Sequence, residues 1–305
     1  MPYRQGARWP LADLLLKGRG ARRKSASPHT QQEETNMERT IVVTGAASGI
    51  GAATANHLCE HGFRVIACDL RDADVIADLS TPEGRAALVE GVASKSGGKI
   101  DAIVANAGGG PVETNVQLNF FGAVATLQGL RPLLQQSPAP RAVAVSSIGS
   151  LFAVRTDLVE ACLAGNESEA VVIGRDVAAE ATRAGADKER VTETVYGNAK
   201  LALNRWCRSA ASGADWAGVG ILLNVVALGV YDTPAAAFIL EDPERRSMIE
   251  QHTPLRHAFP GRPQDAAALL AWLTSADNTQ LTGQVLFADG GFEASVRGGL
   301  EGVAR

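Results

Sequence analysis

The segment TIVVTGAASGIG at residues 40–51 decides the fold. Its β-branched run Thr40–Val43 is typical of a buried strand, and a Gly-rich turn follows before a stretch that we expect to be helical over Gly51–His61. Glycines in such a strand–turn–helix unit let the main chain approach a pyrophosphate, which then lies against the positive end of the helix. The sequence therefore predicts a dinucleotide site formed by Gly45, Ser48, Gly49, Ile50 and Gly51.

Short apolar runs recur along the rest of the chain. We expect further strands at Phe63–Cys68, Ile100–Ala105, Ala142–Val145, Gly220–Val226 and Gln284–Phe287, with amphipathic stretches between them. This alternation favours right-handed βαβ units, which place the strands in one parallel sheet covered on both faces. The expected fold is α/β, a Rossmann-type doubly wound parallel sheet in three layers, α/β/α.

The same pattern suggests how the chain is divided. We expect a single catalytic domain over residues 37–305, preceded by an extension at 1–36. Two long segments interrupt the alternation, a mostly helical insertion over 151–195 and a Pro-containing lid over 232–263. Segments of this length inside a compact domain usually form lids or contact surfaces.

The extension differs in charge from the rest of the chain. Residues 1–36 contain seven Lys or Arg and three acidic residues, whereas the whole chain has a net charge of -4. The segment is a disordered extension (or the product of an upstream start codon), a targeting peptide, or, as the least favoured reading, a nucleic-acid-binding arm. The acidic body offers no basic face for nucleic acid, and we expect no nucleic-acid partner.

Composition also excludes other classes. No uncharged apolar stretch reaches the roughly 20 residues of a membrane helix, so we expect no membrane partner. The cysteines, which lack CxxC spacing, are best explained as structural thiols in a reducing compartment, and we expect a cytoplasmic protein. They are Cys59, Cys68, Cys162 and Cys207. The five histidines form no cluster with ligand spacing, so no metal is expected.

Asp69 ends the second predicted strand, 18 residues after Gly51. A carboxylate at this place accepts hydrogen bonds from the hydroxyls of an adenosine ribose and repels a 2′-phosphate. We therefore expect NAD as cofactor rather than NADP. Arg71 could attract a phosphate but does not remove the repulsion at Asp69, and the alternative is that Asp69 is only a turn residue.

Tyr196 and Lys200 are spaced i, i+4 on a helical pattern, which places them on one helix face. A free phenol with a pKa near 10 exchanges protons poorly at neutral pH. A neighbouring ammonium stabilises the phenolate and lowers that pKa, as general acid–base catalysis requires. The pair is a candidate proton-transfer unit.

Several motifs occur in one order along the chain. They are Thr44–Gly51, Asn106-Ala107-Gly108, Asn119, Ser146-Ser147, Tyr196 with Lys200, and Asp289-Gly290-Gly291. In this combination the chain resembles a short-chain dehydrogenase/reductase of the TGxxxGIG type over about residues 38–292. The resemblance implies an NAD-dependent alcohol dehydrogenase or carbonyl reductase.

The resemblance also implies roles for single residues. Tyr196 would be the general acid/base, Lys200 would lower its pKa and bind the nicotinamide ribose, and Ser147 would hydrogen-bond the reacting oxygen. Asn119 would anchor a water that relays protons to Lys200. The other cofactor contacts would come from Asn106, Ala107 and Gly108 beside the adenosine, Asp78 and Leu79 at the adenine, and Gly229 and Thr233 at the nicotinamide.

The chain departs from the family pattern in two places. Leu228-Gly229 replaces the usual PG after the strand expected at Gly220–Val226. In addition, 49 positions separate Ser147 from Tyr196, where most members have about a dozen by resemblance. The long spacing, with Asn119 only 13 positions after Asn106, resembles the 3α-hydroxysteroid dehydrogenase/carbonyl reductase branch and its coniferyl-alcohol dehydrogenase relatives. That likeness implies a homodimer, although the insertion could instead be an inert surface element.

The substrate is indicated only by the apolar side chains of the lid. These are Tyr231, Phe238, Ile239, Leu240 and Met248. They suggest a pocket for a hydrophobic secondary alcohol such as a hydroxysteroid, or else they only pack the lid. An aryl-allylic alcohol is the alternative substrate, and a catalytically silent NAD-binding sensor is the alternative function.

Overall fold

Seven parallel strands form one sheet in the order β3-β2-β1-β4-β5-β6-β7. The computed structural model describes residues 39–152 and 155–298, so the extension predicted at 1–36 lies outside the described residues. The strands are β1 (Thr40–Thr44), β2 (Arg64–Asp69), β3 (Val75–Ile76), β4 (Ala102–Ala105), β5 (Arg141–Ser147), β6 (Leu222–Leu228) and β7 (Val285–Ala288). This is the Rossmann strand order with a seventh strand added, and it confirms the predicted fold class.

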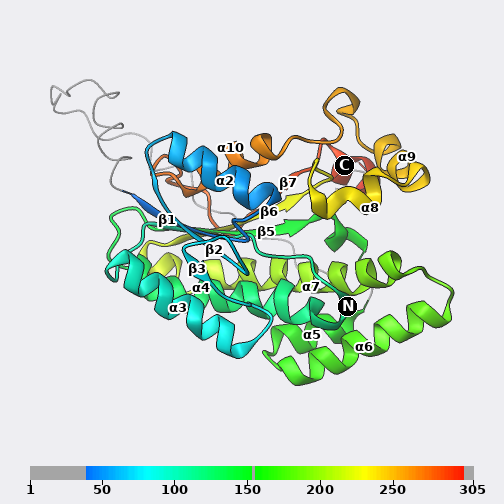
Figure 1. Ribbon diagram of the computed structural model, residues 1–305, viewed down its shortest axis with the longest axis horizontal. Helices are drawn as coiled ribbons and strands as arrows, with labels where there is room; N and C mark the ends of the chain where they lie inside the picture. Colours follow the sequence, from blue (N-terminus) through cyan, green and yellow to red (C-terminus); the bar gives the residue numbers. More distant parts are fainter. Residues whose placement is uncertain (1–38, 153–154, 299–305) are drawn as a thin grey trace, which may run out of the picture.

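Helices cover both faces of the sheet (Figure 1). One layer holds α2 (Gly49–Glu60) and α10 (Pro263–Thr274), and the other holds α3 (Pro82–Ser96), α4 (Ala123–Leu134) and α7 (Lys188–Ala211). Alternate side chains of β1 point to opposite faces of the sheet. Ile41 and Val43 pack in the apolar cluster on the α2 side, whereas Val42 packs in the cluster on the α4 side. The β-branched run in the sequence is thus buried on both faces, as a central parallel strand requires.

The predicted insertion forms two helices of its own. After the 3-10 turn η3 (Ile148–Phe152), the chain continues through α5 (Thr156–Leu163) and α6 (Glu167–Arg183) before α7 begins. Both helices contact α7, on the side of α7 away from the sheet (Figure 1). The last part of the predicted 151–195 segment is therefore the first two turns of α7 itself.

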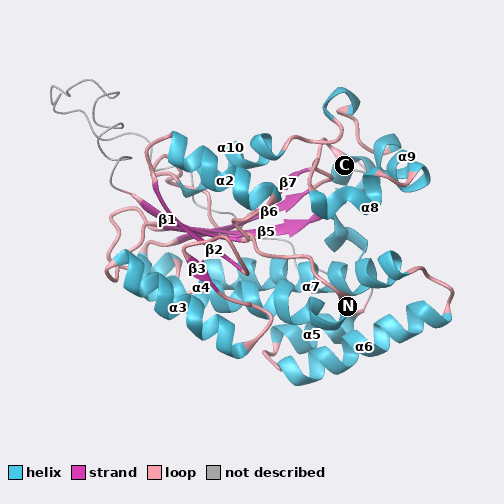
Figure 2. Cartoon of the chain, in the orientation of Figure 1, coloured by secondary structure: helices cyan, strands magenta, loops and turns pink. Residues whose placement is uncertain are grey.

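The lid segment is a loop with short helices, visible beyond β6 and β7 in Figure 2. It contains η5 (Pro234–Ala236), α8 (Ala237–Leu240), α9 (Pro243–Gln251) and η6 (Arg256–Ala258). Its two ends are joined, because Asp232 N donates to Gly261 O at 2.8 Å and Gly261 N donates to Val230 O at 3.0 Å. A Cβ on Gly261 would lie 2.8 Å from the Tyr231 ring, so this junction requires glycine.

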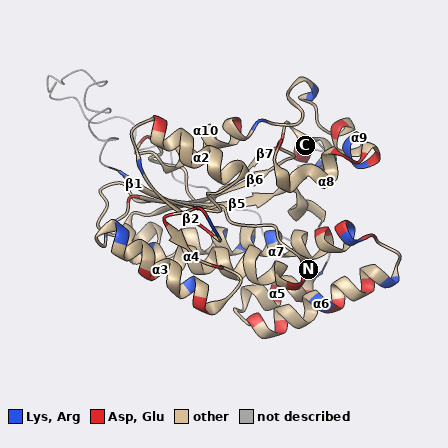
Figure 3. Ribbon diagram, in the orientation of Figure 1, with Lys and Arg blue, Asp and Glu red and all other residues tan. Residues whose placement is uncertain are grey.

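The remaining short elements are η1 (Val112–Thr114), the π-helix η2 (Gln117–Gly122), η4 (Ala217–Val219) and α11 (Phe292–Arg297). Both signs of charge alternate along the outer helices α3, α6 and α9 (Figure 3). None of the helices in the described part of the chain combines the length and apolar character needed to cross a membrane.

Candidate active site

The carboxyl ends of β1 and β4 lie side by side at the point where the strand order reverses, and the glycine turn follows β1 there. Gly45 and Gly49 have φ values of 69° and 54°, which favour glycine. A Cβ on Gly51 would lie 1.9 Å from Gly45 O, so the first turn of α2 packs directly on the main chain of the loop. Ser48 caps α2 without a side-chain hydrogen bond, which leaves the first amides of the helix available to an anion.

A hydrogen-bond network fixes this turn to the end of β4. Thr44 Oγ1 accepts from the amides of Asn106 and Ala107, both at 3.0 Å. The Asn106 side chain donates from Nδ2 to Thr44 O at 3.0 Å and to Gly45 O at 3.4 Å. Sequence reasoning did not assign Thr44 a role, although its place immediately before the first glycine of the motif was a usable signal.

Asp69 lies against the glycine turn. Its Oδ2 accepts from Ala47 N at 2.9 Å, and its Oδ1 accepts from Leu70 N at 2.6 Å. These bonds hold the carboxylate against the glycine turn. Asp74, which accepts from Ala67 N at 3.0 Å, adds a second carboxylate nearby, whereas Arg71 is exposed.

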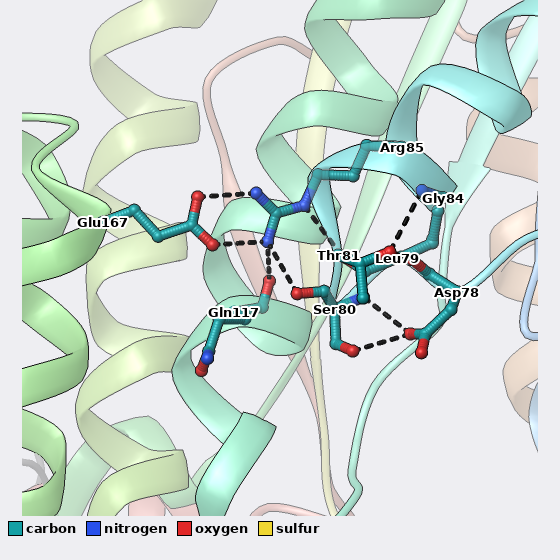
Figure 4. A network of polar contacts seen from close by, with 8 residues as sticks. All are labelled: Asp78, Leu79, Ser80, Thr81, Gly84, Arg85, Gln117 and Glu167. Carbon is teal, nitrogen blue, oxygen red and sulfur yellow. Dashed lines mark hydrogen bonds and ion pairs between the residues drawn. The ribbon is translucent and has the colours of Figure 1, made fainter.

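Asp78 and Leu79 form a turn after β3. Asp78 Oδ1 accepts from the amide and the hydroxyl of Ser80, at 2.9 and 2.7 Å (Figure 4). Leu79 is 5% exposed and packs against Gly122 of η2, where a Cβ would lie 2.8 Å from Leu79 O. The turn is thus held against the π-helix and is connected to Asp69 through the bond from Ala77 N to Asp69 O, 2.9 Å long.

Ser147, the last residue of β5, meets Tyr196 of α7. A hydrogen bond joins their side chains, and Ser147 Oγ also accepts from Gly149 N at 3.1 Å. A Cβ on Gly149 would lie 3.3 Å from the Tyr196 ring, so the loop after β5 passes close to the phenol. Burial raises the pKa of Tyr196 to about 12, and the hydrogen bond from Ser147 acts in the opposite direction.

Lys200 lies one helical turn further along α7 and is only 2% exposed. Its Nζ donates to Val145 O at 2.9 Å and lies 5.5 Å from the centroid of the Tyr196 ring. Burial lowers the pKa of Lys200 to about 8. Burial of the phenol therefore opposes the lowering of the Tyr196 pKa that we expected, and the ammonium lies over the phenol ring.

Asn119 lies in the π-helix η2 and is fully buried. Its Oδ1 accepts from Gly109 N and its Nδ2 donates to Gly109 O, both at 2.9 Å, so the side chain fixes the loop after β4. A Cβ on Gly108 would lie 2.8 Å from Asn119 Oδ1 and 3.1 Å from Lys200 Nζ. The side chains of Asn119 and Lys200 thus both lie close to Gly108, where a larger residue would displace them.

Gly229 and Thr233 lie beyond β6. Gly229 N donates to Ala288 O at 3.0 Å. A Cβ on Gly229 would lie 2.7 Å from Asp289 Cα, so glycine is needed here although Leu228 replaces the usual proline before it. The Thr233 methyl faces the glycine turn, because a Cβ on Gly49 would lie 3.4 Å from Thr233 Cγ2. The start of the lid therefore lies beside the N-terminus of α2.

The lid residues do not all form one pocket. Ile239 joins an apolar cluster with Ile148, Ile249, Phe292, Leu151, Val230, Phe259 and Phe287. Phe238 and Met248 are exposed, Leu240 is partly buried, and the Tyr231 hydroxyl donates to Ala288 O at 3.0 Å. Sequence reasoning missed Phe292, whose ring contacts Phe152 edge to face at 6.1 Å, although it directly follows the Asp289-Gly290-Gly291 motif.

Comparisons with known proteins identify relatives of this chain. The family model described as Enoyl-(Acyl carrier protein) reductase matches residues 45–293. The chain is 34% identical over 265 residues to the 3-alpha-hydroxysteroid dehydrogenase/carbonyl reductase of Comamonas testosteroni, which covers 84% of this chain and 97% of that protein. It is 30% identical over 277 residues to the cis-4-hydroxycyclohexanecarboxylate dehydrogenase of Sinomonas cyclohexanicum, with coverage of 86% and 99%.

A solved structure extends the likeness to the fold. The 3-alpha-hydroxysteroid dehydrogenase from Pseudomonas sp. B-0831, complexed with NADH, is 35% identical, with a TM-score of 0.75 and coverage of 85% of this chain and 98% of that one. Both sequence and structure therefore match proteins of one family over nearly their whole length. The chain belongs to the short-chain dehydrogenase/reductase family of oxidoreductases, the family that its motifs indicated.

Proposed function

We propose that this protein interconverts a hydrophobic secondary alcohol and its ketone, with NAD as the hydride carrier. The observation that carries the proposal is the convergence of Ser147, Tyr196 and Lys200 at the carboxyl end of β5, on the same edge of the parallel sheet as the glycine turn that follows β1. A hydroxyl, a phenol and an ammonium are the groups that proton transfer to or from an alcohol oxygen requires.

The three side chains have separate tasks in this scheme. When bound, the nicotinamide supplies the carbon that accepts or gives up hydride. Ser147 orients the substrate oxygen, and Tyr196 takes its proton during oxidation or returns one during reduction. Because burial raises the pKa of Tyr196 to about 12 even with the hydrogen bond from Ser147, we expect its phenolate to need further stabilisation from the Lys200 ammonium. Lys200, with a pKa near 8, can hold or release a proton close to neutral pH.

The preference for NAD rests on Asp69. Its carboxylate is tied to the Ala47 amide at 2.9 Å, so it cannot easily turn away from a phosphate on the ribose. A phosphate on the ribose would bring a second negative charge toward the Asp69 carboxylate, which like-charge repulsion disfavours, and Asp74 adds to the negative charge. The expected result is a much lower KM for NAD than for NADP, measured with one alcohol under the same conditions.

The substrate class rests on the apolar cluster beneath the lid. Ile148 lies immediately after Ser147, and Ile249 and Phe292 complete the buried part of the cluster. This environment favours a bulky apolar ligand, in keeping with the hydroxysteroid named for two relatives. We place a hydroxysteroid-like alcohol first and an aryl-allylic alcohol second.

An absorbance assay tests the whole proposal. Purified protein is offered NAD or NADP with hydroxysteroid, aryl-allylic and simple secondary alcohols, and formation of the reduced cofactor is followed. Turnover with NAD and a hydroxysteroid is the expected result, whereas turnover only with aryl-allylic alcohols would replace the substrate class. Binding of NAD without turnover of any alcohol would contradict the enzymatic proposal and favour an NAD sensor.

We also place the protein in the cytoplasm as a homodimer. Cys68, Cys162 and Cys207 are buried free thiols, and burial raises the pKa of Cys68 and of Cys162 to about 12, which suits a reducing compartment. Static light scattering of the purified protein measures the oligomeric state, and a monomeric mass would contradict the dimer.

A further inference from the structure

The insertion reaches the turn that carries Asp78 and Leu79. Arg85, in the first turns of α3, forms a two-pronged ion pair with Glu167, the first residue of α6 (Figure 4). The distances are 2.7 Å from Nη1 to Oε2 and 2.8 Å from Nη2 to Oε1. A planar guanidinium facing a carboxylate in this way has one preferred orientation.

The same guanidinium holds the main chain of three other positions. Nε donates to Leu79 O at 2.8 Å, and Nη2 donates to Ser80 O at 3.4 Å and to Gln117 O at 3.0 Å. Its orientation by Glu167 therefore determines where the carbonyls of the Asp78–Leu79 turn and of the π-helix η2 can lie. Only 11% of the Arg85 side chain and 31% of the Glu167 side chain is exposed, so water screens this network weakly.

Two glycines make the packing around this network close. A Cβ on Gly84 would lie 2.0 Å from Asp78 O, so α3 begins directly against the turn. A Cβ on Gly174 would lie 3.0 Å from Val116 Cγ2, so α6 also packs on the residue that precedes η2. The insertion is thus fastened both to the turn and to the π-helix that carries Asn119.

We propose that Arg85 and Glu167 are positioning residues for the adenine half of the dinucleotide, through which the insertion sets cofactor affinity. The inference rests on the proposed function, which takes NAD as cofactor, and on the family resemblance, which implies that the adenine lies at Asp78 and Leu79. Neither residue touches the reacting atoms, which lie near Ser147 and Tyr196. The insertion then contributes to binding of the cofactor, in contrast to an inert surface element.

The network predicts which half of the cofactor is affected. Without Glu167 the guanidinium keeps its bonds to the main chain but loses the partner that fixes its plane, so the turn loosens. Ligands that contain the adenine half lose affinity. A ligand that contains only the nicotinamide half binds as before, because the Ser147–Tyr196–Lys200 side of the crevice is unchanged.

The test compares three ligands by isothermal titration calorimetry: NADH, ADP-ribose and reduced nicotinamide mononucleotide. Glu167→Gln, which preserves the shape of the side chain but removes its charge, is expected to raise the Kd for NADH and for ADP-ribose by about fivefold, equivalent to ~1 kcal/mol. Binding of the mononucleotide is expected to stay the same. In steady state, KM for NAD rises while kcat at saturating NAD is unchanged.

Glu169→Gln is the matched control. Glu169 lies in the same turn of α6, but its carboxylate accepts only from Asn166 Nδ2, at 2.8 Å, and does not reach Arg85. This variant is expected to bind all three ligands as the wild type does. Arg85→Lys is the second variant, because it keeps the charge but loses the two-pronged geometry, and it is expected to reproduce the Glu167→Gln defect.

Two outcomes would overturn the proposal. Unchanged NADH affinity in both Glu167→Gln and Arg85→Lys would show that the network does not position the adenine. An equal loss for all three ligands would indicate a general packing defect. Failure of the proposed function looks different. A wild-type protein that binds NADH but turns over no alcohol contradicts the enzymatic proposal and leaves this one open to the calorimetric test, whereas a wild type that binds neither NADH nor ADP-ribose overturns both.

Discussion

The glycine turn and the Ser147–Tyr196–Lys200 group lie at the same carboxyl edge of the sheet but are built in opposite ways. The turn uses neighbouring residues, 44–51, and its shape depends on side chains that are missing, since a Cβ on Gly51 would overlap Gly45 O. The proposed catalytic group joins side chains 49 positions apart, from β5 and α7, across an insertion. Local backbone geometry can therefore be recognised directly in a sequence, whereas the second group needs the whole sheet to bring it together.

The largest expected effect is on kcat, from a change in the Ser147–Tyr196–Lys200 group that leaves the glycine turn as it is. Tyr196→Phe removes the hydroxyl that exchanges the proton, and kcat is expected to fall by about 10²–10⁴-fold. The Kd for NADH should stay within about twofold, because the glycine turn is untouched. Stopped-flow turnover and calorimetric binding on one preparation check both numbers. Retained turnover would exclude Tyr196 as the general acid/base.

The second effect concerns the cost of burying Lys200. The pKa of Lys200 in the folded protein is about 8, below the ordinary 10.5. Between these two pH values the unfolded chain binds more protons than the folded protein does, so the contribution of Lys200 to the free energy of unfolding rises with pH. Below pH 8 the burial cost is fully present. Lys200→Met removes this dependence. Between pH 8 and 10.5 the free energy of unfolding of the wild type should therefore rise by up to about 3 kcal/mol relative to that of the variant. Urea unfolding across that range measures it, and parallel curves for the two proteins would contradict it.

The third effect probes the turn. Gly51→Ala introduces a Cβ where the main chain of Gly45 lies, so the loop must move and stability is expected to fall by about 2 kcal/mol. Cofactor affinity should fall with it. Gly97→Ala, at a helix end with open space around it, is a control for packing, though its φ of 66° adds strain of its own. Thermal unfolding with and without NADH checks this, and a Gly51→Ala protein with normal affinity would show that the close approach is unnecessary.

The smallest effect is on cofactor choice. Asp69→Ala removes the carboxylate beside the ribose, and the ratio of kcat/KM for NAD to that for NADP is expected to fall about tenfold. Asp74→Ala is the comparison, since Asp74 accepts a main-chain bond further along the same loop and should change the ratio less. If the ratio is the same in wild type and Asp69→Ala, discrimination lies elsewhere.

The sequence predicted the fold class and family, which are confirmed, because β-branched runs and Gly-rich turns report local geometry directly. It missed β3, whose two residues are too short to form a pattern, and it placed the start of the first helix two residues late. It indicated that residues 151–195 are helical, but not that the segment ends inside α7.

The site was predictable to a different extent. Ser147, Tyr196 and Lys200 were predicted from spacing and order; the structure brings their side chains close together, and their catalytic roles stay a prediction. The ion pair of Arg85 with Glu167 was not predictable, because the two residues are 82 positions apart and neither belongs to a motif. The effect of burial on the Tyr196 phenol was missed for a related reason, since a one-dimensional pattern shows the neighbouring ammonium but not the packing around the ring.

The junction between Val230 and Gly261 has a consequence for how such a protein diversifies. Because the two ends of the lid meet on the sheet, everything between them is a closed loop whose length and sequence can change while β6 and α10 keep their places. Lengthening such a loop costs little free energy, about 0.6 kcal/mol for each doubling. Duplicated copies of this chain can therefore acquire new substrates by exchanging the part of this loop that follows Thr233, and a segment transplanted there from a relative should leave Ser147, Tyr196 and Lys200 in place.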